Sequence, residues 1–361
     1  MATGIILGPL VLGWFQGPET RDDLRLLADL TLVLILFSDA ANANLSTLKN
    51  RIQIPARMLL IGLPGVILLG FGAALVLFDV LTLFEAAILG TILAATDAAL
   101  GKAVISDKRL PGWIREGLNA ESGLNDGLCV PILFIFIALA LDTAGKVAPV
   151  AEVVQELGIG LAVGLGVTFA GAQLLRLCLR LGWVTEVWRQ VTIGALALTC
   201  FSLAQELHGS GYIASFSGGL LFGYLLSDTK HDFVLAAEGI GETLAMMTWL
   251  LFGIAVVGEI IGLMTWQIIA YAVLSLTVVR MLPIYLSLIG TGATVKDRLF
   301  LGWFGPRGLA SIVFAIIVLD SKLPGAEFIG LVVIVTVFLS LIAHGFSAKP
   351  LSAWLLKNRK G

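Results

Sequence analysis

Long apolar stretches fill this chain from its first residues to near its end. About 20 apolar residues in a helix cross the roughly 30 Å hydrocarbon core of a bilayer. Gly/Pro pairs and short polar runs separate the stretches and mark where each helix ends. The pattern therefore predicts about twelve transmembrane helices, at approximately residues 3–16, 24–45, 53–78, 83–104, 113–141, 152–180, 187–208, 211–226, 232–258, 264–290, 298–319 and 326–348.

The connections between these helices are short, so neighbouring helices are expected to pack antiparallel. Hydrophobic residues make up 58% of the chain and charged residues 13%, against roughly a quarter charged in a soluble domain. No stretch carries the polar content of a second, soluble domain. We expect one all-α polytopic membrane domain over residues 1–361, with the lipid bilayer as a partner and no nucleic acid partner.

Residue types that bind metals and cofactors are few and scattered. The three cysteines lie in apolar stretches and the three histidines fall at predicted helix ends; these residues are Cys129, Cys178, Cys200, His208, His231 and His344. None of them has the spacing of a zinc or haem site. We therefore expect no cofactor and no resident metal.

Basic residues gather in alternate connections, which tests the helix map through the positive-inside rule. One set of alternate connections, together with the C-terminus, holds 17 of the 23 lysines and arginines. The opposite set holds Arg21, Arg25, Lys146 and Lys322. Because basic loops stay in the cytoplasm, both termini are predicted to be cytoplasmic, in a plasma (inner) membrane of bacterial type.

The two remaining basic residues, Arg280 and Arg307, fall inside predicted helices. A charge at the centre of a bilayer costs at least about 2.5 kcal/mol and persists only when it is paired or wetted. Four acids also fall within apolar stretches: Asp39, Asp97, Glu121 and Asp126. Charges within the membrane are therefore the strongest functional signal in this sequence.

The fourth predicted helix carries Thr96 and Asp97 between Gly90 and Gly101. A carboxylate beside a hydroxyl, flanked by glycines in mid-membrane, favours a break in the helix. Unwound backbone is tolerated at that depth where it lines a cavity, and its carbonyls can then hold a dehydrated cation. The alternative is a regular helix in which Thr96 bonds back to its own turn and Asp97 extends toward the cytoplasmic end.

The fifth predicted helix carries Glu121, Ser122, Asn125 and Asp126. Glu121 and Asn125 are four residues apart and share a face, while Asp126 lies about 100° further round. Asp126, the Asn125 amide and nearby hydroxyl or backbone oxygens, with Ser122 as a secondary candidate, make a hard-oxygen site for a small cation. A carboxylate of this kind can be neutralised by a cation or by a proton but not well by both, which is the minimal requirement for exchange. The alternative is a buried acid that pairs with a neighbouring helix for packing alone.

Arg280 lies deep in the tenth predicted helix and needs an anionic partner, for which Glu121 is the first candidate. In that arrangement the pair is structural. Asp126 is then the acid left to titrate, so each turnover moves one cation against one proton.

The eleventh predicted helix contains Arg307 within the run Gly302-Trp-Phe-Gly-Pro-Arg-Gly308. The proline and three glycines predict a second break, where Arg307 offsets the negative ends of half-helix dipoles. The alternative is an arginine that extends from the helix end to lipid phosphate.

The two interrupted helices are the middle members of two triplets, the third to fifth and the tenth to twelfth predicted helices. The predicted orientations of the triplets are opposite. An inverted repeat with two interrupted helices that cross places an ion site near the midplane. Asp39, past the middle of the second predicted helix, is a secondary candidate that reaches a polar funnel or only the headgroups.

Together these residues resemble a known family, the monovalent cation:proton antiporters, in the sodium/proton exchanger branch that includes the bacterial NhaP-type proteins. The resemblance covers nearly the whole chain. Its motifs, in order, are Gly4-Ile-Ile-Leu-Gly-Pro9, Thr96-Asp97, Glu121-Ser-Gly-Leu-Asn-Asp126, Gly209-Ser-Gly-Tyr-Ile-Ala214, Arg280 and Gly302-Trp-Phe-Gly-Pro-Arg-Gly308.

The resemblance implies a homodimer in which a six-helix core, at approximately 52–145 and 264–348, slides against a dimerisation scaffold, at approximately 1–50 and 150–260. It implies that Asp126 binds Na+ or Li+ and H+ in alternation and that Thr96 and Asp97 complete the site. The Asn-Asp pair is typical of electroneutral exchange, and the family pattern likewise suggests pairing of Glu121 with Arg280.

Three other functions are weighed against this one. Potassium/proton exchange differs only in the cation, which Asn125 and Asp126 do not fix. A non-transporting membrane sensor or assembly protein predicts that Asp126→Glu is harmless. An enzyme, such as an intramembrane hydrolase, is not expected, because Ser122 has no base within a helical turn other than Glu121, which Arg280 is expected to hold.

Overall fold

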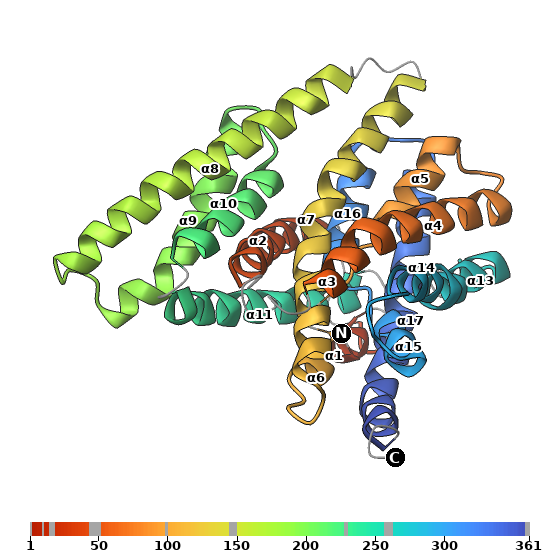
Figure 1. Cartoon of the computed structure of the whole chain (residues 1–361). Coiled ribbons are helices and arrows are strands. Elements are labelled where there is room, and N and C mark those ends of the chain that lie inside the picture. The colour runs from red at the N-terminus through yellow and green to blue at the C-terminus, as the bar shows by residue number, and fades with distance from the viewer. Residues whose placement is uncertain are drawn as a thin grey trace. The chain divides into compact units, whose positions relative to one another are not determined.

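The computed structural model describes residues 2–8, 11–13, 19–42, 52–97, 100–143, 150–226, 230–255 and 263–357, and the regular structure in these ranges is helical, as Figure 1 shows. The chain divides into two compact units. The first unit is Met1–Asn44 with Val147–Gly258, and the second is Leu45–Lys146 with Glu259–Gly361. Each unit is therefore assembled from two separate segments of the chain.

The first unit is built around α10, which contacts α2, α8 and α9, while α11 contacts α2 and α1 (Figure 1). Its helices are α1 (Ala2–Leu7), α2 (Glu19–Asn42), α8 (Val150–Arg180), α9 (Glu186–Glu206), α10 (Gly211–Leu225) and α11 (Lys230–Ala255). Gly219 of α10 lies so close to the carbonyl of Phe37 in α2 that a Cβ would collide with it. The glycines of α10 thus allow close backbone packing in this unit.

The second unit consists of two triplets of helices with the same order of elements. The first triplet is α3 (Gln53–Arg57), η1 (Met58–Gly62) and α4 (Leu63–Leu77); α5 (Leu83–Ile92) and α6 (Lys102–Ile105); and α7 (Gly112–Thr143). The second triplet is α13 (Trp266–Leu274), η2 (Ser275–Val279) and α14 (Arg280–Ser287); α15 (Val295–Trp303) and α16 (Leu309–Asp320); and α17 (Ala326–Lys357). In each triplet the second helix is interrupted and the third is long and continuous.

Two local features recur in both triplets. The first helix of each contains one π-helical turn, η1 or η2, and η1 packs against α14 while η2 packs against α4. The interrupted helix of each begins with a reciprocal capping box, formed by Thr82 with Glu85 and by Thr294 with Asp297. A capping box satisfies two backbone donors at a helix start, so the sequence specifies where each interrupted helix begins.

Several predicted boundaries are wrong. The helix predicted at 3–16 ends at Leu7, and residues 11–13 form a turn with Gly13 in the left-handed region (φ 62). The last predicted helix, α17, runs to Lys357 instead of ending at 348. The breaks predicted in the fourth and eleventh helices are confirmed, because each of these helices is split in two. The ends predicted at 16, 45 and 258 lie outside the described residues.

Within the described residues, five helices are long and apolar enough to cross a membrane: Gln53–Leu77, Gly112–Asp142, Ala151–Arg180, Trp266–Ser287 and Ala326–Lys357. Shorter apolar helices are Leu83–Ile92, Val191–Glu206, Gly239–Ile254 and Leu309–Asp320. An all-α, multi-pass membrane protein is confirmed, whereas the count of twelve spanning helices is not established.

Candidate ion-binding site

The first break begins where α5 ends, at Ile92, and continues through a turn at Leu93 and Ala94 into non-helical backbone at residues 95–97. Residues 91–96 are all buried. Gly90, just before the break, packs against backbone of α4, where a Cβ would collide with the Ile67 carbonyl oxygen. Buried backbone without helical hydrogen bonds needs other partners, and side chains of the unit supply them.

The second break lies between Trp303 at the end of α15 and Leu309 at the start of α16. Two of its glycines leave room for charged side chains. A Cβ on Gly305 would collide with the Arg280 guanidinium, and one on Gly308 would collide with the Asp97 carboxylate. The glycines therefore let the unwound backbone approach two charged groups closely.

The two breaks contact each other directly. The Asp97 backbone N–H donates to the carbonyl of Pro306 (2.8 Å). The Ser311 hydroxyl donates to the carbonyl of Ile92, the last residue of α5 (3.1 Å). The C-terminal end of α5 thus lies against the N-terminal end of α16.

Opposite charges meet the ends of the half-helices. Asp97 Oδ2 accepts the backbone N–H of Leu309, the first residue of α16 (3.0 Å), so a carboxylate caps the positive end of that helix. Arg307 Nη1 donates to the carbonyl of Ala95, just beyond the negative end of α5 (3.2 Å). Both placements are favourable for helix dipoles, and burial strengthens them.

Polar side chains of α7 hold the first break. Asn125 Oδ1 accepts the backbone N–H of Thr96 (3.2 Å), and Asn125 Nδ2 donates to Thr96 Oγ1 (2.6 Å). The hydroxyls of Thr96 and Ser122 lie 3.1 Å apart. These three side chains are at most 4% exposed, so they form a buried polar cluster that fixes the backbone of the break.

Glu121 and Arg280 form a buried bidentate ion pair. Arg280 Nη1 lies 2.7 Å from Glu121 Oε1 and Arg280 Nη2 lies 2.9 Å from Oε2, and the side chains are 1% and 0% exposed. Asn125 Nδ2 also donates to Glu121 Oε1 (3.3 Å). Paired guanidinium and carboxylate charges cancel, and the bidentate geometry offsets part of their desolvation cost.

Asp126 follows Asn125 on α7 and is 6% exposed. Its carboxylate lies in the same membrane-spanning helix as the ion pair and the polar cluster. An ionised carboxylate is expensive to bury, and a bound cation or a proton removes that expense. Asp126 therefore lies on the helix that holds the first break, where its ionised form is costly unless it is neutralised.

Arg307 is fully buried, and within the described residues its Nε and Nη2 have no hydrogen-bond partner. A buried donor without a partner is costly. Its Nη1 donates to the backbone carbonyl of Ala95. Arg307 thus acts on the negative end of α5 through its charge more than through matched hydrogen bonds.

Asp39, the secondary candidate, lies in α2 and is partly buried. It belongs to the first compact unit, whereas Thr96, Asp97, Ser122, Asn125 and Asp126 belong to the second. The crossing of the two breaks is formed entirely within the second unit.

Three buried polar residues were missed from the sequence. Glu85 Oε2 accepts the backbone N–H of Thr82 (2.9 Å), and Glu85 Oε1 accepts that of Gly325, next to α17 (2.7 Å). Ser340 and His344 of α17 contact the second break. The Thr-x-x-Glu spacing is a capping-box pattern that could have identified Glu85, whereas His344 was assigned to a helix end because α17 was predicted too short.

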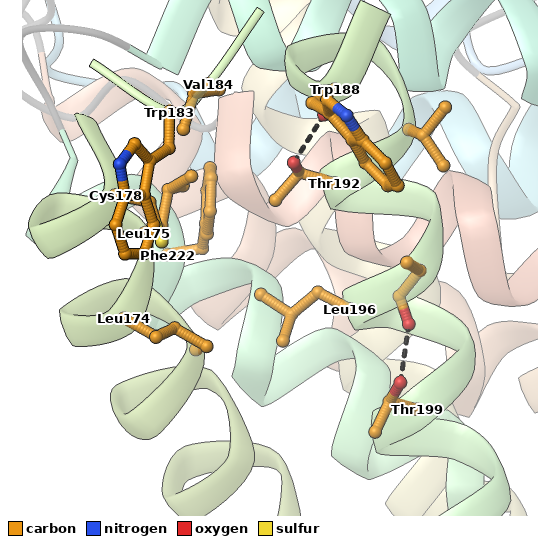
Figure 2. Close-up of a pocket in the computed structure, with 13 residues that line it drawn as sticks. Leu174, Leu175, Cys178, Trp183, Val184, Trp188, Thr192, Leu196, Thr199 and Phe222 are labelled. Carbon is orange, nitrogen blue, oxygen red and sulfur yellow. Dashed lines mark hydrogen bonds between the residues drawn. The ribbon is translucent and has the colours of Figure 1, made fainter. Parts of the chain in front are cut away.

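A cavity of about 410 Å³ lies in the first unit between α8 and α9, with Phe222 of α10 at one side. Figure 2 shows Trp183 and Trp188 among its mostly apolar walls. The hydroxyls of Thr192 and Thr199 donate back to carbonyls of their own helix. Its chemistry suits apolar groups, unlike the oxygen-rich cluster at the crossing.

A model of the family described as sodium/hydrogen exchanger, transmembrane, matches residues 1–354 of this chain. The K(+)/H(+) antiporter NhaP of Alkalimonas amylolytica is 27% identical over 365 residues, which cover 98% of this chain and 61% of that protein. The Na(+)/H(+) antiporter 2 of Zygosaccharomyces rouxii is 24% identical over 340 residues, which cover 89% of this chain and 42% of that protein. The chain thus spans between two fifths and two thirds of the length of these relatives.

Among solved structures, the sodium proton antiporter MjNhaP1 from Methanocaldococcus jannaschii at pH 8 superposes with a TM-score of 0.78. The match covers 95% of this chain and 90% of that one, at 20% sequence identity. At this identity the likeness establishes the fold.

Proposed function

The chain belongs to the sodium/hydrogen exchanger family, and on this premise we propose that it is a secondary active antiporter that exchanges Na+ or Li+ for H+. Its location is the plasma (inner) membrane, with both termini in the cytoplasm. The observation that carries the proposal is the crossing of two buried helix breaks, held by Thr96 and Asn125, on the helix that presents Asp126. Broken helices with exposed carbonyls suit ion sites in transporters.

Asp126 is the group that cation and proton occupy in turn. Glu121 is committed to Arg280 by two hydrogen bonds, so this pair carries no net charge through the cycle. One alternating carboxylate moves one cation against one proton, and the exchange is electroneutral. A site that must lose its proton to bind a metal ion has a pH-dependent affinity.

The other site residues divide into ligands and supports. Thr96 contributes its hydroxyl and the unwound backbone beside it. Asn125 holds that backbone, since its Oδ1 accepts the Thr96 N–H, and Ser122 completes the hydroxyl cluster. Asp97 completes the site from the N-terminus of α16, and Arg307 compensates the charge at the end of α5.

The second compact unit is the transporting core, and the first is the scaffold through which two copies form a homodimer. Two observations support this division. The boundaries of the units fall near residues 45, 147 and 259, and the crossing with its buried charges lies within the second unit. The scaffold helices lack such a cluster in the part of the chain that the structure describes.

Potassium is the competing cation, because the relative from Alkalimonas amylolytica is named a K(+)/H(+) antiporter. A hard-oxygen site with one carboxylate does not by itself select Na+ over the larger K+. The choice between sodium and potassium is therefore made by experiment.

The test is proton movement in proteoliposomes that contain the purified chain and an imposed pH gradient. Sodium, lithium and potassium are added in turn, for the unaltered chain and for Asp126→Asn. We expect sodium or lithium to collapse the gradient with the unaltered chain, and Asp126→Asn to reduce the rate to that of empty vesicles while the protein stays monodisperse.

If only potassium collapses the gradient, the transported cation is potassium and not sodium. No response to any cation from well-folded protein would overturn exchange, and full activity of Asp126→Asn would overturn the role of that carboxylate. A valinomycin-clamped control distinguishes electroneutral from electrogenic exchange, since an imposed voltage changes only the latter.

A further inference from the structure

The second break is closed by a relay of side chains from α17 that the proposed transport cycle does not use. The Arg307 backbone N–H donates to Ser340 Oγ (2.7 Å). Ser340 Oγ lies 3.1 Å from His344 Nδ1, and His344 Nε2 lies 2.9 Å from the carbonyl oxygen of Trp303. Trp303 ends α15 and Arg307 lies just before α16, so the relay connects the two ends of the break.

The chemistry of the bonded atoms fixes the direction of this relay. A carbonyl only accepts, so Nε2 carries a proton and donates to Trp303. Ser340 Oγ accepts from Arg307, which leaves its hydroxyl proton to donate to Nδ1 of a neutral ring. The neutral imidazole, protonated at Nε2, therefore satisfies every member of the relay.

The His344 ring can also adopt a second hydrogen-bond pattern. His344 Nδ1 also lies 2.9 Å from the backbone carbonyl oxygen of Ser340. When Nδ1 takes up a proton it donates to this carbonyl, and the Ser340 hydroxyl loses its acceptor. The bond from Nε2 to Trp303 then becomes charge-assisted and stronger. The same ring thus has two hydrogen-bond patterns that differ by one proton.

We propose that His344 is a positioning residue of the exchanger, which through Ser340 and Trp303 sets the shape of the second break, and whose protonation slows the conformational step. The proposal rests on the proposed function. The neutral ring leaves the break able to rearrange, whereas the imidazolium holds the end of α15 more tightly and adds positive charge beside the break. Neither effect requires contact with the transported ion.

Charged groups from several helices surround the ring. Arg307 in the break and Arg280 of α14 act on it electrostatically, and Glu121 of α7 offsets Arg280. Lys349 of α17 and Lys102 of α6 are exposed. Glu85 of α5 and Asp320 of α16 lie at the other ends of the helices that pack against α17.

The His344 ring is buried and held by its neighbours. His344 is 4% exposed, and its ring packs against the indole of Trp303 with centroids 5.2 Å apart. Trp303 is itself anchored, because its Nε1 donates to Ser347 (2.8 Å). The ring is held in one orientation, so a change of its proton state changes hydrogen bonds instead of moving the side chain into solvent.

The experiment separates maximal rate from cation affinity in proteoliposomes with equal pH on both sides, between about pH 5.5 and 8.5, which brackets histidine titration. Competition at Asp126 raises the KM for the cation as pH falls and leaves the maximal rate unchanged. We expect the unaltered chain to show, in addition, a fall in maximal rate of at least about threefold on the acidic side.

His344→Gln is the informative variant, because its amide oxygen accepts from Ser340 and its NH2 donates to Trp303, but it does not titrate. We expect its maximal rate to stay flat across this range while its KM still rises. His208→Gln, at an exposed histidine in the first unit, is the matched control and should follow the unaltered chain. An acid-side fall in maximal rate that persists in His344→Gln, or that is absent from the unaltered chain, overturns the proposal.

Ser340→Ala gives a second reading if His344→Gln does not fold. Without the hydroxyl, the neutral ring loses its donor, so the fall in maximal rate should move to higher pH. An unchanged midpoint contradicts the relay. Absence of any cation-driven proton flux at alkaline pH in the unaltered chain is a failure of the proposed function instead, which this design therefore distinguishes.

Discussion

The two helix breaks of the second unit face the same physical problem and solve it with different chemistry. In each, a backbone N–H of the unwound segment is accepted by a side chain of the third helix in its own triplet. Asn125 of α7 accepts from Thr96, and Ser340 of α17 accepts from Arg307. The first break contains Asp97 and is held by hydroxyl groups, whereas the second contains Arg307 and is held by the imidazole of His344.

This difference indicates a division of labour between the repeats. The first repeat holds Thr96 and Asp97 and presents Asp126, the oxygen groups that suit a cation. The buried guanidinium groups of the described residues, Arg280 and Arg307, belong to the second repeat and balance negative charge on the first. In the proposed function, the first repeat therefore binds the cation and the second compensates charge.

The strongest way to break this balance is Arg280→Ala. Glu121 would be left as an uncompensated buried charge, which destabilises a protein by about 3–5 kcal/mol. We expect a large fall in the apparent melting temperature in detergent and loss of folded protein from the membrane, measured by fluorescence-detected size exclusion.

Arg109→Ala is the matched control for that prediction. Arg109 pairs with Asp107 at 2.8 Å on the connection between α6 and α7, where its hydrogen bond lowers the pKa of the Asp107 carboxyl. Arg109 is exposed, so its loss should leave the melting temperature nearly unchanged. Equal stability of Arg280→Ala and Arg109→Ala would contradict a structural role for the buried pair.

A second test moves the two breaks apart by one methyl group. In Gly308→Ala the new Cβ collides with the Asp97 carboxylate, and overpacking of this kind costs about 1–3 kcal/mol. We expect a lower melting temperature and a reduced transport rate at every cation concentration. Gly72→Ala in α4, where nothing lies within 4 Å of the added Cβ, should be neutral or slightly stabilising. Equal behaviour of the two alanine variants would mean that Asp97 does not lie tightly on the second break.

The smallest effect is expected from Arg307→Lys, which keeps the positive charge of the second break and removes the guanidinium donors. Because Arg307 acts mainly through its charge, Lys should retain stability within about 1 kcal/mol, the size of a helix-end charge effect. Arg307→Gln removes the charge and should lower the transport rate further. The measurement is initial cation-driven proton flux at saturating cation, and a lysine variant as impaired as the glutamine variant would show that hydrogen-bond geometry matters more than charge.

Much of the fold could be predicted from the sequence, because the bilayer thickness sets the length of the apolar segments and the positive-inside rule sets the charge of the loops. The helical membrane fold and the family are confirmed. The runs around Thr96 and Arg307 indicated interruptions because glycine and proline weaken helices locally. In contrast, the sequence analysis did not predict the π turns η1 and η2, which pack against α14 and α4 respectively.

The site was only partly accessible from the sequence for a related reason. The place of Asn125 beside Asp126 predicts an ion ligand, which stays a prediction, and it does not reveal that the Asn125 amide also holds Thr96. Such tertiary hydrogen bonds join residues far apart in the chain. The same holds for Ser340 and His344, whose positions opposite the second break depend on how α17 packs. The roles assigned to Asp126 and its neighbours stay predictions.

The buried ion pair also constrains how the chain is made. Glu121 and Arg280 are 159 residues apart, so at about 5–20 residues per second a ribosome synthesises α7 roughly 8–30 seconds before α14. During that interval Glu121 has no guanidinium partner, and an unpaired charge in the membrane is costly. We therefore expect the pairing of Arg280 with Glu121 to be a late step of assembly, and nascent chains that stop before Arg280 to be substrates for membrane quality control.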